Sequence, residues 1–223
     1  QNKYLLTPTH ELLLHTDISM FRQYKTSAVW QYGDSSTYNT VRAWWQQAEN
    51  NFSYIDTYND DKKTQQTNNA LTNHGIIYDF YKKVKNKSQL QAGAWYQQKY
   101  KETPTLMGSN SISNKNQKDI IARSYCNFST VVHSWAIQQL LGFTYDFLNY
   151  RDKIFPDDEN YFIDSKIKIA KIQYNAQATK SFRNTIKTKY GLQYDFHHVN
   201  TTNYKDNIHI HQLALWASLF GYF

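Results

Sequence analysis

The stretch Thr185-Ile186-Lys187-Thr188-Lys189-Tyr190-Gly191-Leu192-Gln193-Tyr194-Asp195-Phe196 alternates between two kinds of side chain. Its even positions are Ile, Thr, Tyr, Leu, Tyr and Phe, whereas its odd positions are Thr, Lys, Lys, Gly, Gln and Asp. Successive side chains of a β-strand point to opposite faces, so the stretch predicts a strand with one apolar and one polar face. Soluble strands usually have about five or six residues, whereas a tilted strand that crosses a bilayer needs about ten. The length of this run favours a membrane-spanning strand.

Runs of the same kind recur along the whole chain and predict up to nine strands. The first is irregular, which makes residues 1–36 an uncertain lead-in of strand and turn. In another, Ile167 and Ile169 are odd whereas Ile172 and Tyr174 are even, so we predict a β-bulge near Ala170-Lys171, because one extra residue reverses the facing of the residues after it. The predicted strands are 12–32, 37–54, 74–84, 89–100, 119–130, 135–148, 166–179, 185–196 and 207–222.

The connections between these runs alternate in length. Outer-membrane barrels have short periplasmic turns and longer extracellular loops. The sequence therefore predicts an all-β fold, an antiparallel transmembrane β-barrel segment of about eight or nine up-and-down strands, in which residues 1–223 form a single barrel portion. A soluble β-sandwich also gives alternating strands and mixed loops, and remains the alternative fold. The predicted loops are 56–72, 102–118, 150–164 and 198–206, and the predicted turns are 33–36, 85–88, 131–134 and 180–184.

The amino-acid composition fits the strands of a β-barrel wall better than the packed core of a soluble protein. Aromatic residues make up 17% of the 223 residues, with 19 Tyr, 12 Phe and 6 Trp, although the mean hydropathy is only −0.75. A barrel with a thin apolar band, aromatic girdles and a polar interior has this balance. The net charge of +7 does not indicate nucleic acid, because the lysines are spread along polar strand faces and loops. The single cysteine, Cys126, excludes an internal disulfide and is read as a buried or wall-facing thiol.

Motifs that carry chemistry are few. His209-Ile210-His211 has the two-histidine spacing of metal-dependent nicking enzymes, but no third ligand and no nucleophilic tyrosine on a later helix accompany it. We interpret the two histidines as polar-face residues of a barrel strand. The acidic groups near residues 60 and 158 lack the spacing of a calcium loop. The sequence therefore predicts no catalytic residue, no metal site and no cofactor.

Several short segments resemble the strand patterns of a known protein family. Tyr190-Gly191-Leu192-Gln193-Tyr194-Asp195-Phe196 is similar to a Gly-Leu-Arg-Tyr-Asp strand pattern, echoed by Leu141-Gly142-Phe143-Thr144-Tyr145-Asp146-Phe147. Both copies have another residue in place of Arg, namely Gln193 and Thr144. Together with Val41-Arg42-Ala43-Trp44-Trp45-Gln46-Gln47 and Gly93-Ala94-Trp95-Tyr96-Gln97-Gln98, they resemble the barrel of TonB-dependent outer-membrane receptors of the cobalamin and siderophore group.

This resemblance implies a 22-stranded barrel filled by an N-terminal plug, which this chain does not contain. The chain begins at Gln1 and ends at Phe223, which resembles the terminal aromatic residue of many outer-membrane proteins. We therefore expect a C-terminal piece of a longer receptor, with a small closed barrel of about eight strands as the alternative. The implied activity is energy-coupled import of a scarce nutrient such as cobalamin or an iron chelate, not catalysis.

The resemblance also implies partners and a place. These are outer-membrane lipid, a small nutrient ligand, and TonB only through a plug outside this chain, with no nucleic acid. The implied location is the cell outer membrane. A soluble module that recognises glycans through exposed Trp and Tyr is the second function class. Since loops on a rigid scaffold carry recognition, the predicted ligand-binding residues are Trp95, Tyr100, Thr103, Pro104, Leu106 and Met107.

Overall fold

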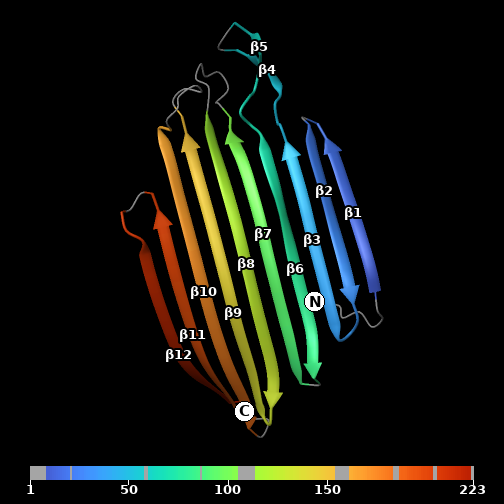
Figure 1. Ribbon diagram of the computed structural model, residues 1–223, viewed down its shortest axis with the longest axis vertical. Coiled ribbons are helices and arrows are strands. Elements are labelled where there is room, and N and C mark those ends of the chain that lie inside the picture. The colour runs from blue at the N-terminus through green and yellow to red at the C-terminus, as the bar shows by residue number, and fades with distance from the viewer. Residues whose placement is uncertain are drawn as a thin grey trace.

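In the computed structural model, the described residues form twelve strands (Figure 1). The structure describes residues 9–20, 22–57, 60–85, 87–104, 114–153, 161–182, 186–202 and 205–221. The strands are β1 (Thr9–Ser19), β2 (Gln23–Gly33), β3 (Thr37–Ala48), β4 (Ser53–Asp56), β5 (Lys62–Gln65), β6 (Leu71–Lys85), β7 (Ser88–Thr103), β8 (Lys115–Val132), β9 (Trp135–Asp152), β10 (Ile163–Phe182), β11 (Ile186–Thr201) and β12 (Ile208–Gly221).

Ten of these strands form one antiparallel sheet in the order β1-β2-β3-β6-β7-β8-β9-β10-β11-β12. Apart from the separate β4–β5 hairpin, each strand pairs with its neighbour in the sequence. This is the up-and-down order that the sequence predicts. The strands from β6 to β11 are longer than predicted, reaching 18 residues in β8 and β9 and 20 in β10, whereas β3 and β12 are shorter, with 12 and 14 residues.

The first predicted strand, which is irregular in sequence, is broken in the structure, because residues 12–32 contain a hairpin. β1 and β2 pair from Thr9 with Gly33 to Ser19 with Gln23. The turn between them includes Met20 and Arg22, and Arg22 takes a positive φ of 53°. None of the residues that usually mark a turn, such as Gly, Pro, Asn or Asp, stands between Ser19 and Gln23. The sheet therefore has ten strands rather than eight or nine.

From β2 onward the long and short connections alternate as predicted, whereas the short connection between β1 and β2 lies at the end of the long ones. The long connections lie at one end of the strands, and the other end is where β2 is followed by β3, β6 by β7, β8 by β9, and β10 by β11 (Figure 1). The first long connection carries the β4–β5 hairpin. In the turn after β2, Asp34 Oδ1 accepts hydrogen bonds from the Ser36 amide at 2.7 Å, the Ser36 hydroxyl at 2.7 Å and the Thr37 amide at 2.8 Å. The bonds from Ser36, followed by the bond from Thr37, hold the pKa of Asp34 below its usual value.

The predicted β-bulge near Ala170-Lys171 is wrong. β10 pairs without a break with β9, from Ile163 to Lys180, and with β11, from Ile167 to Phe182. Ile167 and Ile169 therefore face the opposite way from Ile172 and Tyr174. The register shift within the described sheet lies instead between Lys83 and Lys85, where β6 pairs with β7.

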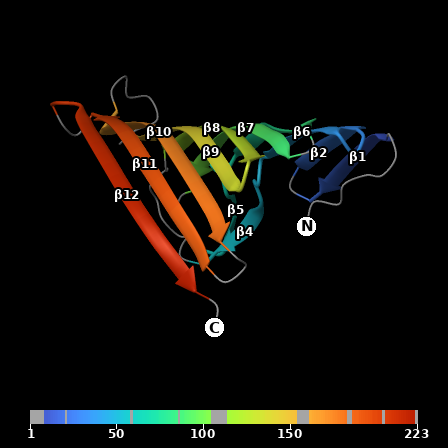
Figure 2. The same ribbon diagram turned by 90° about the horizontal axis from the view of Figure 1, so that it is seen from below.

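The sheet is a single curved layer with almost no core. Ala48, at 2% exposed, is the buried hydrophobic residue of the described chain. Figure 2 shows the sheet bending, with β11 and β12 turned away from the plane of β6–β8. The described strands do not form the two packed sheets of a sandwich, and β1 and β12 are not paired with each other as a small closed barrel requires. Within the described residues, no helix is both long and apolar enough to cross a membrane.

Candidate functional site: the two faces of the sheet

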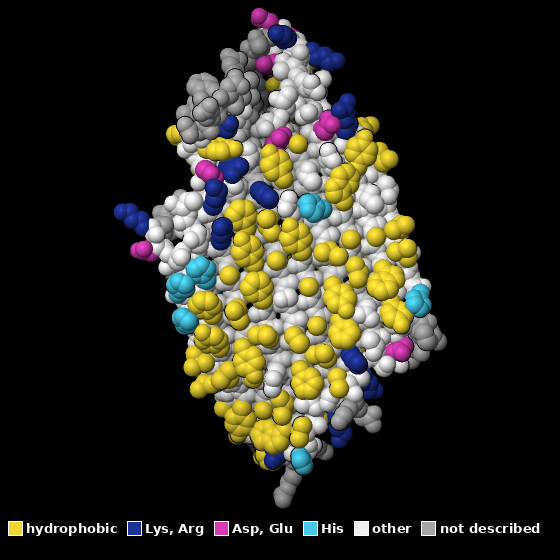
Figure 3. All heavy atoms as spheres, in the orientation of Figure 1, with side chains coloured by type: hydrophobic (Ala, Val, Ile, Leu, Met, Phe, Trp, Pro, Cys, Tyr) yellow, Lys and Arg dark blue, Asp and Glu magenta, His cyan; other side chains and the backbone are white. Residues whose placement is uncertain are grey.

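One face of the sheet is apolar from edge to edge. Residues that pair directly across an antiparallel sheet point to the same side, and the register places rows such as Leu141, Tyr174, Tyr194 and Leu213 on this face. Leu141 and Leu213 are exposed, at 53% and 67%, whereas Tyr174 and Tyr194 are partly buried. Figure 3 shows the apolar side chains gathered on the face seen in Figure 1, and Figure 2 shows that the sheet curls away from it. The apolar face is therefore the convex face.

Charged side chains border the apolar band on this convex face. On β10, Lys168 lies on the side of the band toward the long connections (above it) and Lys180 on the side toward the short turns (below it), twelve residues apart. At about 3.3 Å per residue this is about 40 Å along the strand, or about 30 Å in height for a tilt of about 40°. Above the band, Asp164 pairs with Arg151 at 3.4 Å and with Lys166 at 3.1 Å. Below the band, the Lys180 ammonium lies 5.2 Å from the ring of Trp135. The spacing matches the hydrocarbon thickness of a bilayer, about 30 Å.

The single thiol is exposed on the same face. Cys126 pairs with Leu141 on β9 and with Ala92 on β7, and its side chain is free and exposed. The wall-facing alternative of the sequence prediction is therefore confirmed, and the buried alternative is wrong.

The opposite, concave face is polar and carries a belt of ion pairs at mid-height. Arg42 lies 3.8 Å from Asp79, Arg123 lies 3.9 Å from Asp146, and Lys171 lies 3.5 Å from Asp195. In each pair the two residues sit diagonally across neighbouring strands. The first two pairs are exposed, whereas Asp195 is only 4% exposed and accepts a further hydrogen bond from Gln193 at 2.7 Å. Burial makes the Asp195 pair the most consequential for folding.

The sequence does not reveal this ion-pair belt, because the partners are up to 37 positions apart in Arg42 and Asp79. In the sequence, the residues of the three ion pairs share one feature: each is a charged residue at a polar-face position in the middle of a strand. Which cation meets which acid depends on the register of the strands, and short alternating patterns do not fix that register.

Aromatic rings cover glycines on the concave face. Trp44 pairs with Gly75, Tyr125 with Gly93, and Trp216 with Gly191. A Cβ atom added to Gly93 would stand 2.4 Å from Cε1 of Tyr125, and one added to Gly191 would stand 2.2 Å from the Trp216 ring. The glycines are therefore required for these rings to lie flat on the neighbouring strand. Arg123 stacks on the ring of Trp95, with 5.0 Å between its guanidinium carbon and the ring centroid.

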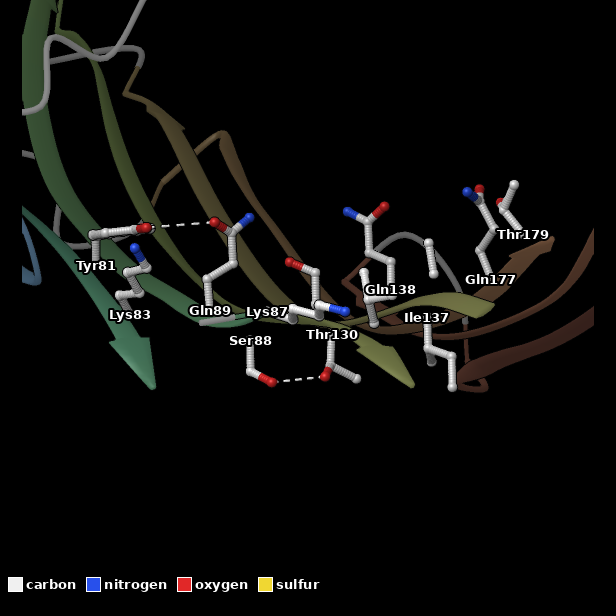
Figure 4. Close-up of a pocket in the computed structure, with 13 residues that line it drawn as sticks. Tyr81, Lys83, Lys87, Ser88, Gln89, Thr130, Ile137, Gln138, Gln177 and Thr179 are labelled. Carbon is white, nitrogen blue, oxygen red and sulfur yellow. Dashed lines mark hydrogen bonds between the residues drawn. The ribbon is translucent and has the colours of Figure 1, made fainter. Parts of the chain in front are cut away.

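Among the hollows that the described residues form on the concave face, two are wide enough to hold a small molecule. One, of about 390 Å³, lies at the ion-pair belt and is lined by side chains including Asp79, Trp95, Arg123 and Tyr125. The other, of about 380 Å³, lies near the short turns and is lined by amides, hydroxyls, two lysines and the apolar side chains of Val131, Ala136 and Ile137. Figure 4 shows Gln89, Gln138 and Gln177 pointing into it, with the Tyr81 hydroxyl donating to Gln89 Oε1 at 3.4 Å. Hydrogen-bonding groups beside aromatic rings suit a hydrated, polar occupant.

The six predicted ligand-binding residues are not brought to one surface. Trp95 points to the concave face and Tyr100, an even-numbered residue of the same strand, points to the convex face. Thr103 ends β7 and its carbonyl accepts a hydrogen bond from Asn68 Nδ2 at 2.9 Å. Pro104 follows it and is half-buried, whereas Leu106 and Met107 lie outside the described residues. Contact of any of these residues with a ligand stays a prediction.

The interpretation of His209 and His211 as polar-face residues is wrong. The register places both on the convex face, in line with Leu213 and Leu215 of the same strand. Among the described residues, no group of three or more His, Cys, Asp or Glu side chains is arranged to hold a metal ion. The third ligand of a nicking enzyme is therefore not found in the described part of the chain.

Comparison with known proteins supports the fold alone. No family model matches the sequence, and no curated protein matches it. Among solved structures, the ferric yersiniabactin uptake receptor FyuA from Yersinia pestis is similar, with a TM-score of 0.53 and 9% sequence identity. The match covers 95% of this chain and 37% of that receptor, so the chain spans little more than a third of the receptor's length. The chain thus forms a large antiparallel sheet that resembles part of a TonB-dependent receptor barrel.

Proposed function

We propose that this chain is part of the barrel wall of an outer-membrane receptor that imports a scarce nutrient, such as cobalamin or an iron chelate, with energy supplied through TonB. The observation that carries the proposal is the opposite polarity of the two faces. A convex band of exposed Leu, Ile, Tyr and Phe side chains, bordered by lysines, would be costly in water. In a bilayer the same band faces hydrocarbon, and the ion pairs of the concave face line an aqueous interior.

The similarity to a ferric yersiniabactin uptake receptor supports the nutrient class. The polar concave face and its two hollows give a transported polar molecule a hydrogen-bonding wall. The long connections lie between strand ends on one side of the sheet, and we expect them to provide the surface for ligand capture.

Cys126 offers a direct test of the membrane placement, because the chain has no other cysteine. In cells that express the complete protein, a membrane-impermeant maleimide should leave Cys126 unreacted until detergent and denaturant expose it. A matched control is Ser53→Cys in a Cys126→Ser background, because Ser53 is exposed on β4 of the first long loop, and this thiol should react at once on intact cells. Equal reaction of both thiols in the folded protein would overturn the membrane placement.

Uptake is tested separately. Disruption of the gene should abolish energy-dependent accumulation of either labelled cobalamin or a labelled ferric chelate, and collapse of the proton gradient should have the same effect. Unchanged accumulation of both would contradict the import function while leaving the fold untouched.

The predicted binding loop has its own experiment. Combined replacement of Pro104, Leu106 and Met107 by Ser in the intact receptor should weaken ligand uptake, since these residues stand at and beyond the end of β7. Replacement of Ser129, which lies on the concave face near the opposite end of the sheet, by Ala is the control. Uptake that the triple replacement leaves unchanged would remove this loop from the site.

A further inference from the structure

Two histidine rings face each other across β11 and β12. His198 and His209 are direct partners in the register, so both point to the convex face. Their Nδ1 atoms are 3.3 Å apart and their ring centroids 4.7 Å apart. Figure 3 shows His side chains gathered at the margin of the apolar face on the side of these strands. The pair therefore stands in an accessible place at the border of the apolar band.

The approach of these two nitrogens needs a positive charge or a proton between them. A neutral imidazole carries its proton on one nitrogen and a lone pair on the other. When both rings carry the proton on Nε2, two lone pairs point at each other across 3.3 Å. Either one ring takes the less common Nδ1–H form and donates a hydrogen bond, or a cation lies between the two nitrogens.

The separation fits one class of cation. Zn²⁺ binds histidine nitrogen at about 2.0–2.1 Å in tetrahedral geometry, which places two such nitrogens about 3.3 Å apart. An octahedral ion with the same bond lengths would need them about 2.9 Å apart. Ca²⁺ and Mg²⁺ prefer oxygen ligands and would not choose two imidazoles. The geometry thus favours Zn²⁺ over the alkaline-earth ions.

The residues around His198 and His209 position the two imidazole rings but supply no further ligand for a metal ion. The Phe196 ring stacks on His209, with centroids 6.1 Å apart and 17° between the planes. His211 is engaged elsewhere, because its Nδ1 lies 2.9 Å from the Tyr194 hydroxyl. No third His, Cys, Asp or Glu of the described chain joins the pair. A metal ion here would keep two positions for water and would exchange readily.

We propose that His198 and His209 bind Zn²⁺ and that the ion clamps β12 to β11 at the end of the strands that carries the long loops. The site is independent of the import function, since it lies on the convex face, away from both hollows.

The test is Zn²⁺ binding to the full chain in detergent, measured by competition with a chromophoric chelator. His198→Ala and His209→Ala should each weaken binding at least tenfold, and Zn²⁺ should raise the unfolding temperature of the unmodified chain but of neither variant. His197→Ala is the matched control, because His197 neighbours the pair in sequence but faces the other side of β11. It should bind Zn²⁺ as the unmodified chain does.

Equal Zn²⁺ affinity in the His198→Ala and His209→Ala variants and the unmodified chain would overturn the proposal, as would an equal loss in His197→Ala. A readout that needs no variant guards against misfolding. On adding Zn²⁺ to the unmodified chain, the Nδ1 nuclear magnetic resonance signals of His198 and His209 should shift while that of His74 stays fixed. If Mg²⁺ shifts the same signals equally, or if Zn²⁺ shifts neither, the site does not exist.

Discussion

The two halves of β10 carry the same kinds of residue in opposite arrangements. From Ile172 to Ala178 the apolar side chains point to the convex face and the amides to the concave face. From Ile163 to Ile169 the isoleucines point to the concave face, and Asp164, Lys166 and Lys168 point outward. The register is unbroken between the halves, so the polarity changes while the backbone continues. Such an inversion is what the proposed membrane placement requires of a strand that passes from hydrocarbon into water.

The largest expected effect on stability comes from placing a charge on the convex face of β10 rather than on its concave face. Ile172→Lys puts a charge in the convex band and should destabilise the membrane-inserted fold by about 2–4 kcal/mol. Gln173→Lys, the next residue on the concave face, should cost less than about 1 kcal/mol, since it meets a polar surface. Reversible unfolding from lipid vesicles measures both. Equal costs would mean that the two faces meet the same solvent.

The ion pairs of β10 extend the comparison. Lys171→Met leaves Asp195, which is 4% exposed, without its cation. The change should lower the free energy of unfolding by about 2–3 kcal/mol, somewhat less than for a pair that is buried on both sides. Lys166→Met removes the shorter contact to Asp164, which is 3.1 Å long, and should cost about 0.5 kcal/mol, because these two side chains on the convex side are 39% and 30% exposed and stay partly hydrated. The same unfolding measurement applies. A greater loss for Lys166→Met would show that distance outweighs burial here.

Packing on the concave face gives a smaller effect. Gly93→Ala places a Cβ atom 2.4 Å from the Tyr125 ring and should destabilise the fold by about 1–2 kcal/mol. Gly142→Ala is the matched control, because its new Cβ atom would meet nothing closer than 3.9 Å. It should be neutral or slightly stabilising, since alanine loses less backbone entropy on folding. If both changes have the same effect, Tyr125 does not lie over Gly93.

The smallest effect lies in the turn after β2, outside the band. Because the pKa of Asp34 is lowered in the folded chain, its hydrogen bonds stabilise the turn above the unfolded pKa, and this contribution is lost as the pH falls through the folded pKa. The amide signals of Ser36 and Thr37 should therefore titrate below pH 3.8. The Asp34→Ala variant should show no such titration. Titration above that pH in the unmodified chain would contradict the hydrogen bonding.

The sequence predicts the strand type and the end-to-end pattern of connections well, because both depend on local alternation and turn residues. Prediction from the sequence fails where one local pattern can arise from two different structures. The phase change between Ile169 and Ile172 looks like a bulge, but it is an inversion of polarity along an unbroken strand. The hairpin at Met20 and Arg22 carries none of the usual turn residues.

The candidate site shows the same limit. Trp95 and Tyr100 are close in sequence, yet five residues along a strand place them on opposite faces. The pairing of His198 with His209, and of Lys171 with Asp195, depends on cross-strand register. That register depends on the whole sheet and not on any one segment.

The most direct test is a spin-label scan of β10 from residue 167 to residue 178 in the membrane, with collision rates measured for oxygen, which concentrates in lipid, and for a water-soluble nickel complex. We predict high oxygen accessibility at the even positions from Ile172 to Ala178 and low values at the odd positions between them. The contrast should fade above Ala170, where Lys168 faces water. Uniform accessibility along the strand, or an oxygen maximum at Ile167 and Ile169, would contradict the assignment of the convex face to lipid.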